Sequence, residues 1–290
     1  RKIIDFALDN GVNFIDTANI YTRGESESIL GRTLGARRRD VVLATKVGGP
    51  VGKLPNESGL NRRLIIRAVD ESLTRLKTDY IDLYYMHFPD TGTPAQEYLE
   101  TMSMLVRSGK IRYYGVSNFS AWQCCALIHK AKEMGAVPPV VTQNVYNLLT
   151  RGVEDEFVPF LEEYKMGLAV FNPLAGGLLT GKHRREQFTQ GTRFDLERGY
   201  ADRYWSEKNF DAIDVLKEAA KDAEMTMIEL SYQWLLGKSC VDSVICGVSK
   251  LAQAEENVSY FREKRLSEGV VEKCDGAWEL LKGSYFNYHR

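Results

Sequence analysis

Two kinds of segment alternate along this sequence, and their alternation limits the chain to a small number of folds. Seven short runs are mostly apolar and β-branched, which is typical of strands buried on both faces. They are Val12–Ile15, Val41–Ala44, Ile81–Tyr85, Tyr113–Val116, Val140–Thr142, Leu168–Phe171 and Ser243–Cys246. Longer stretches with helical spacing lie between these runs, so the sequence predicts parallel strands joined by helices.

The predicted helix from Arg62 to Leu76 illustrates the pattern. Its apolar positions fall on one stripe and its charges on the opposite face. That stripe consists of Ile65, Val69, Leu73 and Leu76. Asn61 is the expected N-cap of this helix. Capping-box spacing marks the starts of two further helices, at Ser120 with Gln123 and at Thr226 with Glu229.

A parallel sheet of this kind is either doubly wound or closed into an eight-stranded barrel. Residues 1–9 have helical spacing, so the seven strands predict an α/β fold, a (β/α)8 TIM barrel whose first strand precedes this numbering. Many strands end in polar side chains, which a barrel collects into a ring at one face. These side chains are Asp16, Lys46, His87, Ser117, Asn118, Gln143 and Asn172. No linker divides the chain, so residues 1–290 are predicted to form a single, N-terminally incomplete barrel domain.

Charge and cysteine content narrow the partners and the compartment. The 38 basic and 39 acidic residues leave a net charge of −1, which indicates neither nucleic acid nor an anionic membrane as a partner. The five cysteines are an odd number, and no C-x-x-C pair occurs among them. These features favour a reducing, cytoplasmic environment. Neither a signal peptide nor a membrane-spanning run is recognisable.

Motifs for binding phosphate through glycines are incomplete. No two glycines lie two residues apart, so the G-x-G-x-x-G fingerprint of a dinucleotide-binding Rossmann fold is absent. The run from Gly176 to Lys182 has the glycine and lysine spacing of a P-loop. His183, however, stands where that motif needs Ser or Thr to hold Mg²⁺. A glycine-rich loop whose N–H groups approach a phosphate remains a reasonable expectation here.

Four residues at or just after three strand ends form a chemically coherent set: Asp16, Tyr21, Lys46 and His87. An unperturbed phenol is a poor acid at neutral pH, but a neighbouring ammonium favours the phenolate and lowers its pKa. Asp16 would keep Lys46 charged, and His87 would orient a carbonyl oxygen. A lone His or a lone Asp–Lys pair is usually structural. The four together instead predict a site for carbonyl reduction, with hydride supplied by another species.

The motifs around these residues resemble the aldo-keto reductase superfamily, and the resemblance extends through nearly the whole chain. The first half contributes N-F-I-D-T-A-N-I-Y, G-E-S-E-S-I-L-G, A-T-K, Y-Y-M-H-F-P-D and G-K-I-R-Y-Y-G-V-S-N-F. The second half contributes V-T-Q-N-V-Y-N, F-N-P-L-A-G-G-L-L-T-G-K and V-I-C-G-V-S-K-L-A-Q-A-E-E-N. With D-R-Y-W and the ending S-Y-F-N-Y-H-R, the chain is most similar to the aflatoxin-aldehyde reductase subgroup. The resemblance implies the barrel and an Asp–Tyr–Lys–His catalytic tetrad at the four residues above.

The resemblance also implies an NADP(H) site. Ser117, Asn118 and Gln143 would hold the nicotinamide carboxamide, and Phe171 would stack on the ring in place of the family's usual Tyr. The pyrophosphate would be lined by Asn172, Leu174, Gly176 and Gly177. The adenosine 2′-phosphate and adenine would be surrounded by Ser249, Lys250, Gln253, Glu256 and Asn257. Lys250 favours NADPH over NADH, although the arginine common elsewhere in the superfamily is replaced by Gln253.

The substrate pocket is predicted from loops 48–59 and 183–209 and from the C-terminal tail. Tyr200, Tyr204 and Trp205 would form an aromatic wall or pack a helix. Arg203 and Arg290 match arginines of the subgroup, where they suit aldehydes that carry a carboxylate. Dialdehydes are further expected substrates.

Two other functions remain open at this point. A regulatory subunit similar to the potassium-channel β-subunits would bind NADPH and act through a partner. A barrel enzyme of unrelated chemistry, such as an isomerase, would not need the nicotinamide-binding residues. The expected partners are a small carbonyl substrate and, at most, a second copy of the chain. We expect a monomer or homodimer with no metal site.

Overall fold

The computed structural model describes residues 1–186, 190–261 and 265–283. Its strands are β1 (Phe14–Asp16), β2 (Val42–Val47), β3 (Ile81–Met86), β4 (Ile111–Ser117), β5 (Val141–Val145), β6 (Gly167–Phe171) and β7 (Ser243–Val244). All seven predicted strands are confirmed, with boundaries that differ by a few residues. The boundaries differ most at the ends of β2 and β5, each of which extends three residues beyond the predicted strand.

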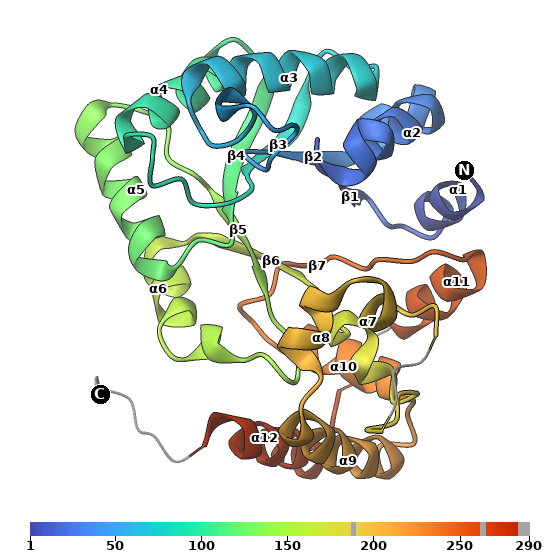
Figure 1. Cartoon of the computed structure of the whole chain (residues 1–290). Helices are drawn as coiled ribbons and strands as arrows, with labels where there is room; N and C mark the ends of the chain where they lie inside the picture. The colour runs from blue at the N-terminus through green and yellow to red at the C-terminus, as the bar shows by residue number, and fades with distance from the viewer. Residues whose placement is uncertain (187–189, 262–264, 284–290) are drawn as a thin grey trace. The chain divides into compact units, whose positions relative to one another are not determined.

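Helices occupy the intervals between strands (Figure 1). The α-helices are α1 (Lys2–Asp9), α2 (Glu25–Leu34), α3 (Arg62–Leu76), α4 (Ala95–Arg107), α5 (Ala121–Met134), α6 (Phe157–Tyr164), α7 (Arg193–Leu196), α8 (Arg198–Tyr204), α9 (Glu207–Asp222), α10 (Met227–Leu236), α11 (Leu251–Tyr260) and α12 (Glu268–Lys282). Short 3₁₀ turns are η1 (Tyr21–Gly24), η2 (Gly35–Asp40), η3 (Pro55–Glu57), η4 (Gly152–Glu154) and η5 (Ala175–Thr180). Among the described residues, no helix combines the length and the apolar character needed to cross a bilayer.

The strands are parallel, and each is the spatial neighbour of the next along the chain. Register places Asp16 beside Ala44, Lys46 beside Tyr85 and Ser117 beside Gln143. The start of β6 continues this order, since the Gly167 N–H donates to the carbonyl of Val140 at 3.0 Å. β6 pairs with β7 in the same parallel sense. This sequential order of parallel strands with intervening helices is the α/β fold of a (β/α)8 barrel.

The chain forms two compact units. The first consists of Arg1–Asn144 and Glu163–Leu168, and the second of Val145–Glu162 and the described part of Ala169–Arg290. In the first unit the predicted helix Arg62–Leu76 is α3, and Asn61 caps it by accepting from the Leu64 N–H at 3.0 Å. Ile65, Val69 and Leu76 of the predicted stripe are buried, whereas Leu73 is only partly buried.

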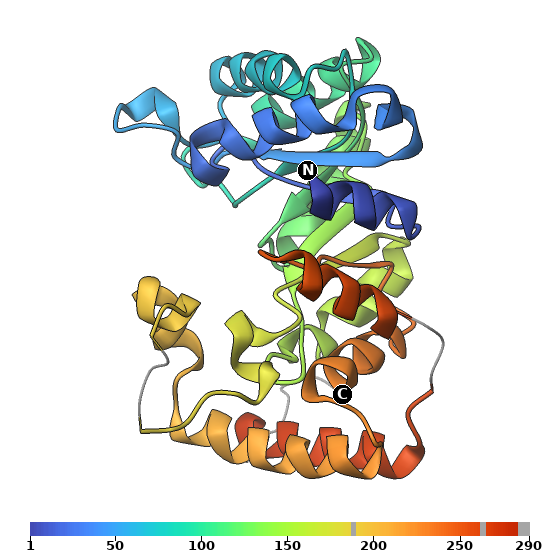
Figure 2. The ribbon, with the colours of Figure 1, turned by 90° about the vertical axis from the view of Figure 1, so that its right-hand side faces the viewer.

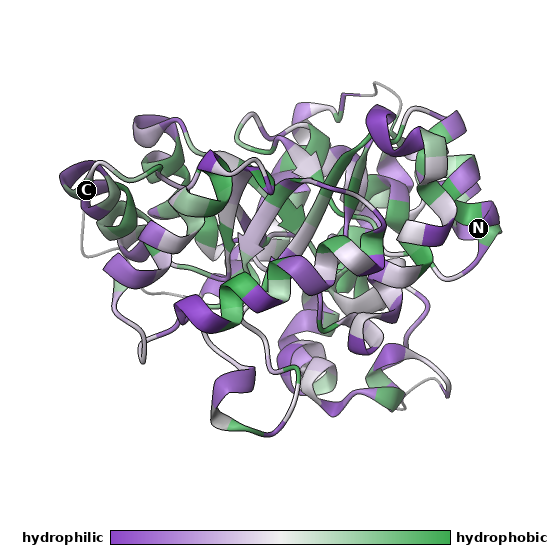
Figure 3. Cartoon of the chain, turned by 90° about the horizontal axis from the view of Figure 1, so that it is seen from above, coloured by the Kyte–Doolittle hydropathy of each residue, from purple (hydrophilic) through white to green (hydrophobic). Residues whose placement is uncertain are grey.

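Close helix packing in the first unit depends on a glycine. A Cβ on Gly31 of α2 would lie 2.2 Å from the Arg75 carbonyl oxygen of α3, so a larger residue there would push the two helices apart. On the face of β2 and β3 that also carries Lys46, an apolar core cluster includes Ala44, Leu83 and Tyr85. Several strands are mostly hydrophobic, whereas the helices alternate between hydrophobic and hydrophilic residues (green and purple in Figure 3).

In the second unit, α9 and α12 lie side by side (Figures 1 and 2). Thr226 caps α10 as predicted, by accepting from the Glu229 N–H at 3.1 Å. The run from Gly176 to Lys182 does not lead into a helix, as a P-loop would. It forms η5 and then an irregular segment, which agrees with the rejection of a P-loop from the sequence.

Candidate active site

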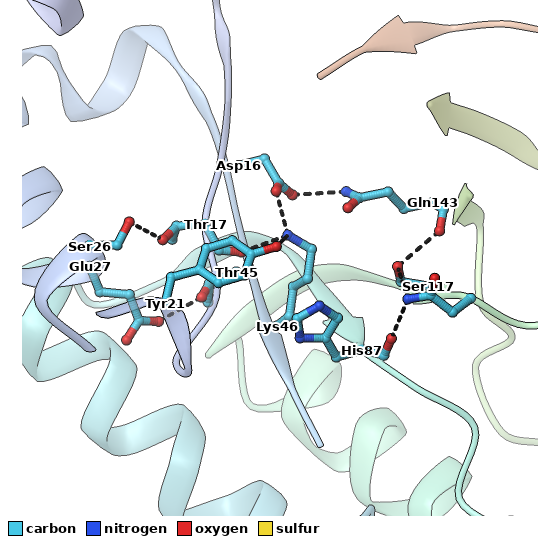
Figure 4. Close-up of polar contacts among 11 residues, drawn as sticks. Asp16, Thr17, Tyr21, Ser26, Glu27, Thr45, Lys46, His87, Ser117 and Gln143 are labelled. Carbon is cyan, nitrogen blue, oxygen red and sulfur yellow. Dashed lines mark hydrogen bonds and ion pairs between the residues drawn. The ribbon is translucent and has the colours of Figure 1, made fainter. Parts of the chain in front are cut away.

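Lys46 lies near the end of β2, and its side chain is completely inaccessible to solvent. Transferring an ammonium from water to a protein interior costs on the order of several kcal/mol, unless charged and polar groups there compensate for the lost hydration. Its Nζ donates to the Asp16 carboxylate, to the Thr17 carbonyl at 2.8 Å and to the Tyr21 hydroxyl at 3.5 Å (Figure 4). Burial lowers the pKa of Lys46, and the charge of Asp16 opposes that shift. The ammonium therefore depends on Asp16 to keep its proton.

Both carboxylate oxygens of Asp16 have donors. Oδ2 accepts from Lys46, and Oδ1 accepts from Gln143 Nε2 at 2.9 Å. The side chain of Asp16 is only 5% exposed, so neither oxygen can rely on bulk water. Gln143, which the sequence places with the cofactor carboxamide, thus also orients the carboxylate that holds the lysine.

Tyr21 is the first residue of η1 and approaches the lysine from the loop after β1. Its ring centroid lies 5.0 Å from Lys46 Nζ and 5.9 Å from the imidazole of His87, which it meets edge-on. Tyr21 is 40% exposed, in contrast to the buried ion pair beneath it. Among these four side chains its phenol is therefore the one that a substrate can reach most directly.

His87 follows β3 directly and is held by its own backbone, because its N–H donates to the Val47 carbonyl at 2.8 Å. Its ring stacks on Phe88 with centroids 4.3 Å apart. Burial, with a smaller contribution from the charge of Lys46, lowers the pKa of His87 to about 3. The imidazole is accordingly neutral at physiological pH. It can hydrogen-bond a carbonyl oxygen but has no imidazolium proton to give.

Polar groups at the ends of β4 and β5 lie in the same unit as these four residues. Ser117 Oγ donates to the Gln143 carbonyl at 2.9 Å, and Asn118 Nδ2 donates to the His87 carbonyl at 3.0 Å. Asn118 adopts a left-handed conformation with φ of 63°. This conformation, which Asn tolerates better than most residues, allows the chain to turn while the amide stays beside His87. The structure therefore brings Ser117, Asn118 and Gln143 together with the predicted tetrad.

The predicted pyrophosphate-binding residues form one loop of the second unit. Asn172 follows β6, and its Oδ1 accepts from the Gly176 N–H at 2.6 Å, while its Nδ2 donates to the Tyr204 hydroxyl at 2.7 Å. Positive φ angles at Asn172, Ala175, Gly176 and Gly177 fold the loop back on itself. A Cβ at Gly176 would lie 2.8 Å from the ring of Tyr200, so only glycine fits there. Phe171 directly precedes this loop and Leu174 lies within it, and both are partly buried.

The residues predicted for the adenosine end cluster at the start of α11, also in the second unit. Gln253 Oε1 accepts from the backbone N–H groups of Ser249 at 2.9 Å and Lys250 at 3.2 Å, and from the Ser249 hydroxyl at 3.1 Å. Gln253, at the third position of α11, thus accepts from the backbone of the N-cap residue Lys250. Glu256 Oε1 accepts from the Tyr260 hydroxyl at 2.9 Å, and Asn257 is buried. Ser249 and Lys250 are exposed.

The predicted substrate residues are only partly described. The guanidinium of Arg203 lies 5.8 Å from the ring of Tyr200, which also receives Arg193 at 4.9 Å. Trp205 joins an aromatic group with His183, Phe194 and Phe210, and Tyr204 is buried, so both have packing contacts. Arg290 and the rest of the C-terminal tail lie outside the described residues, as do residues 187–189 of the second predicted loop.

The first predicted loop, 48–59, is closed on itself. The Gly59 N–H donates to the Gly48 carbonyl at 3.0 Å, and the Val51 N–H donates to the Glu57 carbonyl at 2.8 Å. Asp90, three residues after His87, accepts from the Leu60 N–H at 2.6 Å just beyond the loop. Burial alone would raise the pKa of Asp90, but its bonds to Leu60, Thr93 and Gly92 lower it.

Two further groups that contact or adjoin Lys46 were not predicted from the sequence. The carbonyl of Thr17 accepts from Lys46, and a backbone carbonyl is not recognisable from residue type. Tyr85 is completely buried beside Lys46, and burial together with the charge of Asp16 raises its pKa. The sequence carried a signal for Tyr85, because it lies two residues before His87 and side chains two apart in an extended segment point to the same face. Among the described residues, no group of three or more His, Cys, Asp or Glu could hold a metal ion.

A barrel-type α/β fold with a buried Asp–Lys pair, a reachable phenol and a neutral imidazole defines a site suited to chemistry at a carbonyl group. The model of the Aldo/keto reductase family matches residues 1–279. The chain belongs to this family.

Curated proteins at about one-third identity agree with the match. A protein named aflatoxin B1 aldehyde reductase member 2 from Rattus norvegicus is 35% identical, covering 98% of this chain and 81% of its own length. Aldo-keto reductase family 7 member A3 from Homo sapiens is 34% identical, with 98% and 89% covered. A probable voltage-gated potassium channel subunit beta from Arabidopsis thaliana is 36% identical, with 89% and 80% covered. The chain is accordingly an oxidoreductase that acts on carbonyl groups with a nicotinamide cofactor.

Proposed function

We propose that the protein reduces aldehydes or ketones to alcohols with NADPH and that Tyr21 donates the proton. The contact that carries the proposal is the one between the Lys46 ammonium and the Tyr21 hydroxyl, 3.5 Å apart. A buried cation beside a phenol strengthens it as an acid, which suits general acid catalysis at neutral pH. The neutral His87 leaves Tyr21 as the acid of the set.

In the proposed reaction His87 hydrogen-bonds the carbonyl oxygen and Tyr21 transfers its hydroxyl proton to that oxygen. When bound, a nicotinamide cofactor would provide the hydride that reduces the carbonyl carbon, and it would itself be oxidised. Lys46 stabilises the phenolate that remains on Tyr21, and Asp16 keeps Lys46 protonated. Solvent then returns a proton to the phenolate.

Ser117, Asn118 and Gln143 are proposed to hold the nicotinamide carboxamide. The donor set fits the group, because a carboxamide needs both donors and acceptors and these side chains offer both. Phe171 is proposed to stack on the nicotinamide ring. Asn172, Leu174, Gly176 and Gly177 would line the pyrophosphate, where the left-handed backbone lets phosphate oxygens approach closely. We also propose that residues 1–290 form one barrel domain, since the family model matches residues 1–279.

The preference for NADPH is proposed to come from the start of α11. Lys250 is exposed there, beside Ser249, and helix N-termini favour anions. A 2′-phosphate on these residues would gain a charge-assisted contact that NADH lacks. Gln253 would act indirectly, by fixing the backbone of Ser249 and Lys250. Glu256 and Asn257 are proposed to lie near the adenine.

For the substrate we propose aldehydes that bear a carboxylate, or dialdehydes. Support comes from Arg203, whose guanidinium suits bidentate carboxylate binding, and from relatives named aflatoxin B1 aldehyde reductase. Arg203 packs near Tyr200, which covers Gly176 of the proposed pyrophosphate loop. Arg290 is proposed as a second carboxylate ligand. We also propose a cytoplasmic location, in keeping with free thiols at all five cysteines.

Quenching of NADPH fluorescence on titration, followed by turnover with 4-nitrobenzaldehyde, tests the function. Tyr21→Phe should lower kcat by at least about 100-fold, the lower range for general acid catalysis, and leave the Kd for NADPH nearly unchanged. Tyr113→Phe, a change at an exposed tyrosine of β4, is the matched control and should keep full activity. An active Tyr21→Phe variant would exclude Tyr21 as the acid.

One alternative has specific support, namely a regulatory subunit that binds NADPH. The relative from Arabidopsis thaliana named a probable potassium channel subunit beta is 36% identical. The same titration separates the two functions. Quenching without turnover of any aldehyde favours the regulatory role, whereas turnover at rates typical of enzymes favours the reductase. Failure to bind NADPH would contradict both.

A further inference from the structure

The first turn of α2 contains two polar side chains that turn inward rather than to solvent. Glu27 is completely buried, and Ser26 is partly buried. Both lie a few residues after Tyr21, because η1 (Tyr21–Gly24) continues directly into α2 (Glu25–Leu34). Any bond that fixes this turn therefore also fixes the segment that carries the phenol.

Ser26 links the turn to the strand side of the site. Its Oγ lies 2.7 Å from Thr17 Oγ1, within hydrogen-bond distance (Figure 4). Thr17 is completely buried, and its carbonyl is the group that accepts from Lys46 Nζ at 2.8 Å. Ser26 thus contacts the residue whose backbone holds the ammonium on the side of β1.

Glu27 links the same turn to β2. Its Oε1 accepts from Thr45 Oγ1 at 2.6 Å, and Thr45 directly precedes Lys46. Side chains alternate along a strand, so Thr45 points toward α2 while Lys46 points to the opposite face. Both Glu27 and Thr45 are completely buried. The hydrogen bond therefore fixes the β2 backbone at the residue adjoining the lysine.

The charge of Glu27 is compensated from α3. Arg75 Nε donates to Glu27 Oε2 at 2.7 Å, and the two side chains are 26% and 0% exposed. A buried ion pair is weak support for stability, since apolar residues of similar volume often do as well. A pair that also positions a neighbouring group has a further role. Here the carboxylate of that pair accepts from the residue next to the lysine.

We infer that Ser26 and Glu27 are positioning residues, which set the distance between the Tyr21 hydroxyl and the Lys46 ammonium through Thr17 and Thr45. Together the two bonds attach the turn that follows Tyr21 to both backbone segments that carry or contact the ammonium. The inference concerns the site of the proposed reductase and rests on that function for its catalytic meaning. The distance itself is a property of the fold that is measurable without turnover.

The distance matters because a cation favours the phenolate more strongly the closer it lies. At an effective dielectric constant of about 20, lengthening the separation by about 1 Å raises the pKa of a neighbouring phenol by about 0.8. Described titratable groups around Tyr21 and Lys46 include Asp16 on β1, and Tyr85 and His87 on and after β3. Thr45→Val replaces none of these three, and it removes one hydrogen bond from Glu27.

Thr45→Val tests the inference, because it removes the hydroxyl while keeping the shape. The probe is the ¹³Cζ signal of labelled tyrosine, with the Tyr21 resonance assigned by its loss in Tyr21→Phe. We expect the titration of Tyr21 to move up by about 0.8 pH units in Thr45→Val, from the Coulomb relation above. Thr45→Ser, which restores a hydroxyl, should return it to the wild-type value. Activity should fall about tenfold, within the cost of small misplacements of catalytic groups, with the Kd for NADPH unchanged.

Thr101→Val is the matched control, since Thr101 is a completely buried threonine of α4 whose hydroxyl donates to the Glu97 carbonyl. An unchanged Tyr21 titration in Thr45→Val, or an equal shift in Thr101→Val, would overturn the inference. If Thr45→Val does not fold, Ser26→Ala provides the same comparison from the other bond and should shift the titration in the same direction. If the wild-type protein lacks reductase activity but Thr45→Val still shifts the Tyr21 titration as expected, the proposed function is contradicted and the positioning role is supported.

Discussion

Replacing Asp16 by Asn removes the only carboxylate that contacts the Lys46 ammonium among the described residues. The substitution keeps the shape of the side chain and an oxygen that can accept a hydrogen bond. It removes the negative charge. Burial already lowers the pKa of Lys46 from its usual 10.5, and the charge of Asp16 is the main opposing influence. The pKa of Lys46 should therefore fall further in Asp16→Asn.

Leaving one member of a buried ion pair without its partner usually costs about 3–5 kcal/mol. We expect a loss near the lower figure, about 3 kcal/mol at pH 7, because the unpartnered ammonium can escape part of the cost by releasing its proton. The unfolded chain keeps Lys46 protonated up to about 10.5, whereas the folded variant does not, so the unfolded state binds more protons. The stability of Asp16→Asn should accordingly rise with pH, and the deficit relative to wild type should shrink toward pH 10.

Urea unfolding followed by circular dichroism at pH 6 to 10 measures this difference, with tryptophan fluorescence as a second probe of cooperativity. Asp70→Asn is the matched control. Asp70 forms an ion pair with Lys110 at 2.6 Å, but both side chains are exposed, at 52% and 39%. Such a surface pair contributes about 0–1 kcal/mol. Equal losses in the two variants, or a deficit in Asp16→Asn that is the same at pH 7 and pH 10, would refute the argument.

Four further outcomes follow from the site. Because the pKa of His87 is lowered to about 3, this group should not titrate between pH 5 and 8. The pH profiles of kcat for the wild type and for His87→Gln should therefore have the same shape over this range. Stability should also be lost from pH 6.5 downward by about 1.4 kcal/mol per pH unit in wild type and by less in His87→Gln, because the unfolded state takes up the proton first. Lys250→Ala should weaken NADPH binding about tenfold or more and leave NADH binding nearly unchanged, by fluorescence titration; equal losses would remove its role at the 2′-phosphate. Arg203→Ala should reduce kcat/KM for succinic semialdehyde more than for 4-nitrobenzaldehyde, and equal reductions would contradict carboxylate binding.

The sequence was most informative where the physical signal is local. The helix Arg62–Leu76 and its cap at Asn61 were predicted residue for residue, because apolar periodicity and capping chemistry operate within a few positions. The strands were also recognisable as apolar runs. Their exact ends were not, because the extent of pairing depends on the neighbouring strand. β2, for example, continues past Ala44 to Val47 beside β3.

Partnerships between distant residues were less accessible to prediction. Gln143 was assigned to the cofactor, and only the structure shows that it also donates to Asp16, 127 positions away. Gln253 was placed near the 2′-phosphate, but in the structure its oxygen accepts from the backbone N–H groups of Ser249 and Lys250. A glutamine side chain fits several roles, because it both donates and accepts hydrogen bonds. Which role it takes depends on the groups that the fold brings within hydrogen-bond distance.

By itself, the sequence determined the order of strands and helices and which polar side chains end the strands, because residue type and spacing carry that information along the chain. It also indicated the family through the motifs around Asp16, Tyr21, Lys46 and His87. The tertiary structure alone decided how the lysine is held: by the Thr17 carbonyl, and by a β2 backbone that Thr45 ties to Glu27. Backbone carbonyls carry no mark of residue type, and strand register is set by packing. Contacts of this kind therefore become visible only once the chain is folded.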